Sequence, residues 1–120
     1  MATLTNVEAK LNGGVDVGYE DGSATQTFKY GVADEKLVVL VDNTDAVNDA
    51  LATFVAGDFV QNGYGDQAVS VPAGATVLCE VESGIVKDAN GEVTLELTDP
   101  DGTAFTGAVA DIKVAVVELK

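Results

Sequence analysis

The sequence predicts an all-β fold, an antiparallel β-sandwich of the immunoglobulin-like or jelly-roll-like kind with about eight strands. Short β-rich runs alternate with turn clusters roughly every ten residues, a spacing typical of sandwiches. Thirteen glycines and two prolines fit a chain with many tight turns. Hydrophobic residues make up 47% of the chain and are mostly aliphatic, which is enough for a packed layer between two sheets. A length of 120 residues indicates one domain, covering residues 1–120.

The first quarter of the chain contains one weak and two clearer strand patterns. Residues 4–11 are weakly patterned and precede a glycine pair, so we expect residues 1–12 to form an N-terminal arm or an edge strand. Residues 15–20 alternate valine or tyrosine with polar residues and glycine, which predicts a half-buried strand. Residues 25–30 predict another strand, with one face formed by Gln26, Phe28 and Tyr30.

The middle of the chain contains the strongest strand signal. Residues 36–41 are apolar throughout after Lys36, which predicts a central strand covered on both faces. Residues 42–45 (Asp-Asn-Thr-Asp) predict a turn, because such side chains bond their own backbone. Residues 45–55 fit either a helix with Asp45 as N-cap or a strand, and we expect a loop followed by a strand over residues 50–55.

The next stretch reads as a loop and two strands. Residues 62–66 are rich in glycine and predict a loop. Val69 and Val71 are expected to point inward on a strand that ends at a turn over residues 72–74 (Pro-Ala-Gly). Residues 76–82 alternate, and one face of that strand holds Val77, Cys79 and Val81.

The last third contains the strongest local hairpin signal. The Asn-Gly pair at residues 90–91 predicts a hairpin between residues 85–87 and residues 92–97. The second of these runs alternates aliphatic with polar residues, so one face should be wet. Residues 99–102 (Asp-Pro-Asp-Gly) predict a turn, and the nearly apolar residues 112–119 predict a closing central strand.

The composition argues against catalysis and against nucleic-acid binding. Twenty acidic residues face six lysines, and the chain has no histidine, arginine or tryptophan. Histidine is the usual general base and transition-metal ligand, and arginine is the usual clamp for phosphate. A net charge of −14 repels nucleic acids and anionic lipid, and favours basic partners or loosely held divalent cations. We therefore expect a protein that is not an enzyme and has no cofactor and no nucleic-acid or membrane partner.

The cysteine and the N-terminus bear on where the chain is made. The lone Cys79 excludes an internal disulfide framework and fits a small buried hydrophobe. The first residues lack the basic and apolar regions of a secretory signal, and no run approaches the ~20 apolar residues of a membrane span. We expect synthesis in a reducing host cytoplasm without a signal peptide.

The acidic residues offer two kinds of candidate site. Glu80 and Glu82 share a strand face, as do Glu92 and Glu96, but a glycosidase needs carboxyls that face each other across a cleft, normally with aromatic platforms. Calcium is the better candidate, because turns supply hard oxygen ligands. The weak calcium candidates are Asp42, Asp45, Asp99 and Asp101. The same residue types occur widely in turns without a metal, so no metal ligand is assigned.

Four aromatic residues fit either a ligand patch or the closed ends of a sandwich core. They are Tyr19, Tyr30, Phe59 and Tyr64. If they are exposed they form a patch, and if they are buried they close the core.

Several short pieces, in order along the chain, carry a family resemblance. They cover residues 37–45, 56–58, 65–66, 69–76, 82–84 and 105–107, and an apolar C-terminal strand follows. In this ordered spacing the chain resembles small virion proteins of tailed bacteriophages and prophages of Gram-positive hosts, of the head-decoration type. The family commonly has a more basic strand near Val55 and a serine-arginine pair where residues 82–84 stand here.

The resemblance implies a function without catalytic residues. Such a protein is a non-enzymatic structural component of the virion that binds the capsid exterior and reinforces it. Its partner would be the major capsid protein or another virion protein, and it would act as a homo-oligomer or in repeated copies. The alternatives are a phage tail component, or an immunoglobulin-like module that binds carbohydrate or protein.

Overall fold

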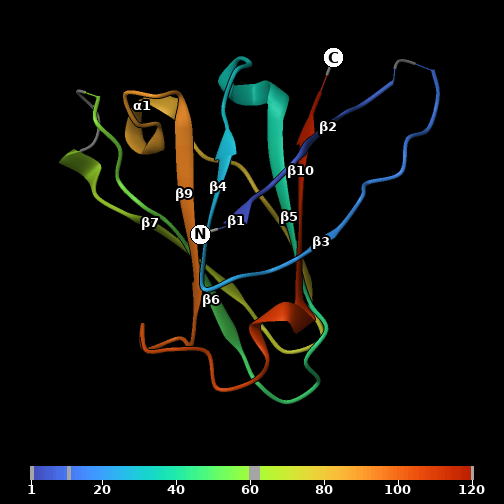
Figure 1. Cartoon of the computed structure of the whole chain (residues 1–120), viewed down its shortest axis with the longest axis vertical. Helices are drawn as coiled ribbons and strands as arrows, with labels where there is room; N and C mark the ends of the chain where they lie inside the picture. Colours follow the sequence, from blue (N-terminus) through green and yellow to red (C-terminus); the bar gives the residue numbers. More distant parts are fainter. Residues whose placement is uncertain (1, 11, 60–62, 120) are drawn as a thin grey trace.

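The protein is a β-sandwich measuring 38 × 35 × 21 Å, seen in a computed structural model that describes residues 2–10, 12–59 and 63–119 (Figure 1). Two sheets of five strands pack face to face, which confirms the predicted all-β sandwich. The described residues form ten strands, two more than the eight expected. Two of the ten, β1 and β3, have only two residues each. Parts of the predicted arm (residues 1–12) and loop (residues 62–66) lie outside the described residues.

The first sheet, called sheet A here, has the strand order β1-β4-β9-β6-β7. Its strands are β1 (Ala2–Thr3), β4 (Thr25–Lys29), β9 (Glu92–Thr98), β6 (Ala50–Phe54) and β7 (Gln67–Val71). β1 runs parallel to β4, and the other neighbours are antiparallel. β7 is therefore one edge of sheet A, and the short N-terminal β1 is the other.

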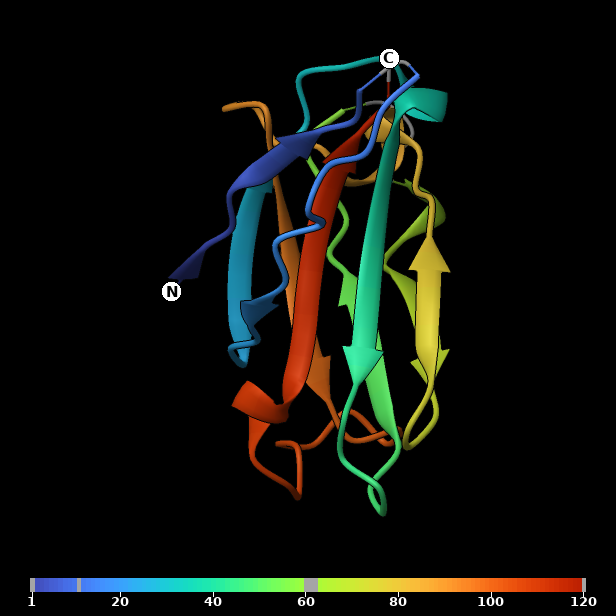
Figure 2. The same ribbon diagram turned by 90° about the vertical axis from the view of Figure 1, so that its right-hand side faces the viewer.

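The second sheet, called sheet B here, has the order β2-β10-β5-β8. Its strands are β2 (Asn6–Glu8), β10 (Ile112–Glu118), β5 (Leu37–Asn43) and β8 (Thr76–Cys79), with β3 (Glu20–Asp21) also paired to β10. β2 runs parallel to β10, so the N-terminal segment crosses from one sheet to the other (Figure 2). β5 and β10 are central, as their apolar runs predicted.

The core lies between the two sheets and is built by alternation. On β9, Val93, Leu95 and Leu97 are buried while the residues between them are half-buried. Phe28 and Phe54 meet edge to face with ring centroids 6.5 Å apart, a geometry that aromatic pairs prefer. The mostly aliphatic core thus contains a contact between two phenylalanine rings.

One buried polar side chain in this core has both its amide nitrogen and its amide oxygen hydrogen-bonded. Gln26 donates from Nε2 to the Leu95 carbonyl at 2.7 Å and accepts from the Ser23 amide at 2.8 Å. These bonds compensate the loss of water around its amide. Gln26 therefore shares the buried face of β4 with Phe28, as the alternation over residues 25–30 predicted.

The strand predicted over residues 15–20 is wrong for residues 15–19, and only Glu20 lies in a strand. Residues 15–19 have no regular structure, and pairing with β10 begins only at Glu20. The Asp16 carboxylate accepts a bond from the Gly18 amide at 2.9 Å, and Gly18 has φ +67°. This side-chain turn and left-handed glycine break the extended backbone that the alternation suggested.

The hairpin predicted before β9 is also wrong. Its first arm, residues 85–87, lies largely within the short helix α1 (Ser83–Val86), where the Lys87 amide donates to the Ser83 carbonyl at 2.9 Å. The turn itself is present, because the Gly91 amide donates to the Asp88 carbonyl and Gly91 has φ +78°. The short helix buries Val86 against the core.

The boundaries of two elements also differ from the sequence prediction. β5 continues through Asn43, whose side chain is buried, so the predicted turn at residues 42–45 begins later. β8 ends at Cys79, and the alternation beyond it continues outside the sheet. Two 3-10 turns, η1 (Asp34–Lys36) and η3 (Val109–Asp111), precede β5 and β10. Across the described residues, no helix has the length and apolarity needed to cross a membrane.

Candidate functional site

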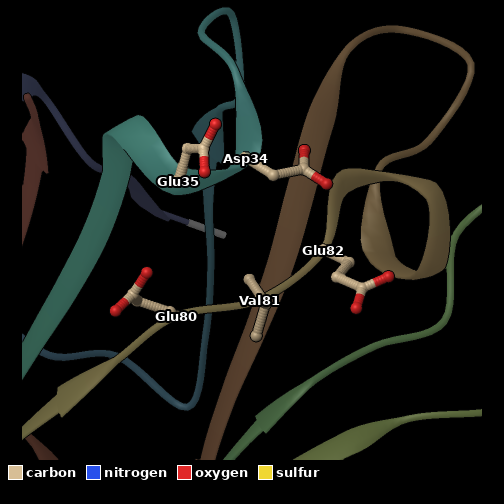
Figure 3. Close-up of a pocket in the computed structure, with 5 residues that line it drawn as sticks. All are labelled: Asp34, Glu35, Glu80, Val81 and Glu82. Atoms are coloured by element: carbon tan, nitrogen blue, oxygen red, sulfur yellow. The ribbon is translucent and has the colours of Figure 1, made fainter.

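An open acidic depression lies at one end of the sandwich (Figure 3). It has a volume of about 300 Å³ and is lined by Asp34, Glu35, Glu80, Val81 and Glu82. The first two come from η1, and the other three from the segment that joins β8 to α1. We call this feature the acidic pocket.

Tyr30 anchors the acidic pocket from inside the core. Its hydroxyl donates to the Val81 carbonyl at 2.7 Å and lies 3.1 Å from the Asp34 carbonyl. Burial raises the pKa of Tyr30 well above its usual value, and the nearby Asp34 carboxylate raises the pKa further. The phenol therefore stays neutral and acts as a hydrogen-bond donor that ties residues 80–82 to the segment after β4.

The carboxylates of the acidic pocket do not converge on one point. Figure 3 shows the Glu80 and Glu82 carboxylates on opposite sides of Val81, and Asp34 instead accepts a bond from the Ser83 amide at 3.3 Å. Within the described ranges, no group of three or more acidic, histidine or cysteine side chains is arranged to hold a metal ion. A glycosidase pair faces a common substrate atom, and this arrangement does not. The pocket offers an anionic surface that attracts positive groups through its summed charge.

Of the first two calcium candidates, Asp42 lies in β5 and Asp45 lies in the connection that follows it. Asp42 accepts a bond from the Thr76 hydroxyl at 3.1 Å. Asp45 accepts from the amides of Val47 at 2.8 Å and Asn48 at 3.0 Å, as in a turn closed by its own side chain. The side-chain and backbone bonds from Asn48 hold the pKa of Asp45 below its usual value.

The other two calcium candidates close the turn after β9. Asp99 accepts from the Thr106 amide at 2.9 Å and from the Thr106 hydroxyl. Asp101 accepts from the Thr103 hydroxyl at 2.6 Å and the Thr103 amide at 3.0 Å, and these bonds lower the pKa of Asp101. All four candidate carboxylates thus accept hydrogen bonds within the chain. Asp45, Asp99 and Asp101 have the turn role that the sequence left open beside calcium, whereas Asp42 lies in β5 and bonds across to β8.

The cysteine and the aromatic residues divide into buried and exposed groups. Cys79 is buried, as expected, and burial raises the pKa of its thiol to about 11, so it stays protonated. Tyr30 closes the core. The other three aromatic candidates are exposed, Tyr19 between β2 and β3, and Phe59 and Tyr64 between β6 and β7.

Sequence reasoning missed the contacts that join distant turns. Gly107 lies so close to Asp45 that an added Cβ would be 2.3 Å from its Oδ2 atom, and the Gly74 amide donates to the Asp45 carbonyl at 3.0 Å. The signal in the sequence was a glycine in each of two turns, without any indication of the shared partner.

Compared with known proteins, the chain matches no protein family, no curated protein and no solved structure.

Proposed function

We propose that this chain is a non-enzymatic structural protein of a phage particle that binds the capsid exterior and reinforces it. One observation carries the proposal. The short pieces on which the resemblance rests are far apart in sequence, yet they lie together in two groups at the two ends of the sandwich. These contacts make the pieces parts of one folded unit, in which local and long-range signals agree.

The first group meets around Asp45. It joins residues 42–45, 72–74 and 105–107, through the Gly74 amide bond to the Asp45 carbonyl and the close packing of Gly107 on the Asp45 carboxylate. An added Cβ on Gly107 would also come within 2.9 Å of Phe105. Glycine is therefore required at the third position of this piece by space alone.

The second group meets around Gly57 at the other end. The Gly57 amide donates to the Ile85 carbonyl at 2.8 Å, directly after the piece at residues 82–84. The Ala56 amide donates to the Asp66 carboxylate at 2.7 Å, which ties in the piece at residues 65–66. An added Cβ on Gly57 would lie 2.1 Å from the Lys87 carbonyl oxygen, so the glycine in this piece is also fixed by close approach.

The charge of the chain suggests how such a protein holds a shell. Repeated copies on a symmetric particle need only modest affinity each, because the particle offers many sites. With a net charge of −14 and no arginine, the long-range attraction is to basic groups on the shell. We expect capsid binding to weaken as salt is raised, since exposed charges are screened over about 8 Å at physiological ionic strength.

The test is to locate the protein in purified particles of the phage whose genome encodes it. Virions are separated into tail-less heads and isolated tails, and each fraction is quantified by mass spectrometry against the major capsid protein. The proposal expects the chain in heads, in a fixed ratio to capsomers, and released by high salt without loss of the shell. Recovery in tails alone supports the tail alternative, and absence from both fractions overturns the virion assignment.

A carbohydrate- or protein-binding module is the second candidate, favoured by two exposed aromatic side chains. Tyr64 is 76% exposed and Phe59 is 47% exposed, and both lie in the connection between β6 and β7. Aromatic side chains of this kind stack on sugars and anchor protein interfaces. Glycan-array binding that is lost in Tyr64→Ala, and kept in Val47→Ala, would favour this candidate over the capsid role.

A further inference from the structure

The two uncovered sheet edges of the described chain lie in its longest uncharged segment. Residues 67–79 contain no acidic or basic residue, in a chain where 22% of residues are charged. This segment consists of β7, the turn over residues 72–75, and β8. β7 is the outer strand of sheet A and β8 is the outer strand of sheet B. Natural proteins usually protect such edges with charged side chains, and this pair of edges has none.

The register shows which backbone groups of β8 are free. The Asn43 amide donates to the Ala75 carbonyl at 2.9 Å, and along the same register Val41 faces Val77 and Val39 faces Cys79. Hydrogen-bonded pairs alternate along an antiparallel ladder. Thr76 and Leu78 therefore direct their N–H and C=O groups away from β5, and no described strand pairs with that edge.

The same reasoning applied to β7 leaves Ala68 and Ser70 facing outward. The Val55 amide donates to the Thr94 carbonyl, so alternate residues of β6 bond to β9 and the intervening ones bond to β7. β8 differs from β7 in one respect. Leu78 is 56% exposed, and of the large hydrophobic side chains exposed in the described residues it alone lies within a strand.

We propose that β8 is a self-association strand, along which a second copy of this chain pairs antiparallel about a twofold axis at Val77. Thr76 of each copy then faces Leu78 of the other, and each such pair exchanges both N–H···O bonds. The arrangement joins the two copies of sheet B into one continuous sheet. Leu78, which is beside Leu40 on β5, gains apolar contact with the second copy.

The charge of the chain favours a second copy of it as the partner that pairs with the edge of β8. Two chains that each carry −14 repel each other, so they approach best where neither presents a charge. A basic partner would instead be drawn to carboxylate-rich surfaces such as the acidic pocket. Asp42, bonded to Thr76, and Glu80, just beyond β8, flank the strand and leave some repulsion to be screened. A contact limited to the edge of β8 belongs to the small, transient class of interface. Salt should strengthen it, because salt screens the repulsion between the two acidic chains.

The main test compares one proline substitution on each open edge. Thr76→Pro removes an outward N–H of β8 at the first residue of the strand, a position where proline is tolerated. Ser70→Pro is the matched control on β7, because its N–H also faces outward. Sedimentation equilibrium of the purified protein should show a concentration-dependent dimer that tightens with added NaCl. Thr76→Pro should weaken that dimer about tenfold or more in Kd, and Ser70→Pro should leave it unchanged.

A second pair of variants tests the side chain. Leu78→Glu adds a charge at the proposed interface, and Val47→Glu adds the same charge at a site that is 82% exposed and remote in sequence. Leu78→Glu should abolish the dimer with an unchanged thermal midpoint, and Val47→Glu should not. Amide exchange measured at low and high protein concentration should slow at Thr76 and Leu78 and stay fast at Ala68 and Ser70.

Three results overturn the proposal. They are a strict monomer at high protein concentration and high salt, a dimer sensitive to Ser70→Pro and insensitive to Thr76→Pro, and concentration-independent exchange at Thr76 and Leu78. The measurements use the chain alone in solution, so their outcome is independent of where the protein resides in a particle.

Discussion

The two lateral sides of the sandwich are closed in opposite ways. On one side, strands within the first 21 residues cover both sheets, because β1 pairs with β4 while β2 and β3 pair with β10. On the other side, β7 and β8 present their outer edges uncovered. We call these the sealed side and the open side. The sealed side shows that this chain covers two of its sheet edges with its own strands. The uncovered and uncharged edges of the open side therefore call for an explanation, and the proposed self-association along β8 supplies one.

The sealed side depends on a single buried anchor between its two short strands. Leu4 is 5% exposed and lies in the core, and its amide donates to the Thr27 carbonyl at 2.8 Å. We predict that Leu4→Ala lowers the free energy of unfolding by about 3 kcal/mol, since it loses buried area and leaves a cavity. Urea unfolding measures the change.

The control for Leu4→Ala is Val47→Ala, at an exposed site, which should change stability by less than about 0.5 kcal/mol. The arm should also detach in part and expose the edges of β4 and β10, so Leu4→Ala should aggregate faster on heating. A loss no larger than that of the control would show that the sealed side is not held by this residue.

Two glycines, one on each side, make the second comparison. An added Cβ on Gly22 would lie 2.5 Å from the Ile112 carbonyl oxygen and 2.8 Å from Leu97, whereas Gly74 has open space and φ +73°. Gly22→Ala should cost about 2 kcal/mol through overpacking, and Gly74→Ala about 1 kcal/mol through backbone strain alone. Thermal and urea unfolding of both variants give the difference, and equal costs would contradict the tighter packing of the sealed side.

Sequence reasoning succeeded where a strand carries its own pattern. The apolar runs of β5 and β10 and the alternation on β9 are local signals, and each of these strands overlaps the run that predicted it. The strand pairing of the sealed side could not be predicted in this way. It pairs β2 with β10, so that Asn6 lies opposite Val116 from the other end of the chain. No local pattern specifies a pairing across such a distance, since the choice depends on which edges remain after the sandwich forms.

The same distinction explains the errors and the site. The Asn-Gly pair correctly indicated a turn, but a turn does not specify that both flanking segments are strands, and here one is α1. The acidic pocket needs η1 to meet the segment after β8, which no spacing in the sequence announces. The turn role of Asp45 was predictable, because its bonds to Val47 and Asn48 are within three residues.

Tyr30 links the two sides, because it follows β4 on the sealed side and bonds to Val81 after β8 on the open side. Tyr30→Phe keeps the ring in place and leaves the buried Val81 carbonyl without this donor. We predict a loss of about 1 kcal/mol in unfolding free energy near neutral pH. The folded-state pKa of the phenol is raised, so its contribution is complete below the unfolded pKa of about 10 and is lost as pH rises above it.

The corresponding measurement is urea unfolding of wild type and Tyr30→Phe from neutral to alkaline pH. The two stabilities should converge as the unfolded-state tyrosine ionises. A difference that stays constant through alkaline pH would mean that the hydroxyl contributes by shape and not as a neutral donor. Tyr64→Phe, at a residue that is 76% exposed, is the control and should leave the stability near neutral pH unchanged.

The smallest expected effect is at the corner of the open side, where Asp45 bonds to Asn48 and supports Gly74. The folded-state pKa of Asp45 lies below its ordinary value of 3.8, so ionised Asp45 stabilises the fold above that pH. The contribution is lost as pH falls through the depressed folded-state value. Asp45→Asn cannot titrate, so wild type should exceed it in stability above about pH 4 and approach it in more acidic solution. Thermal unfolding across this range tests the sign. A gap that widens in acid would show that Asp45 is held against its neighbours and destabilises the corner when ionised.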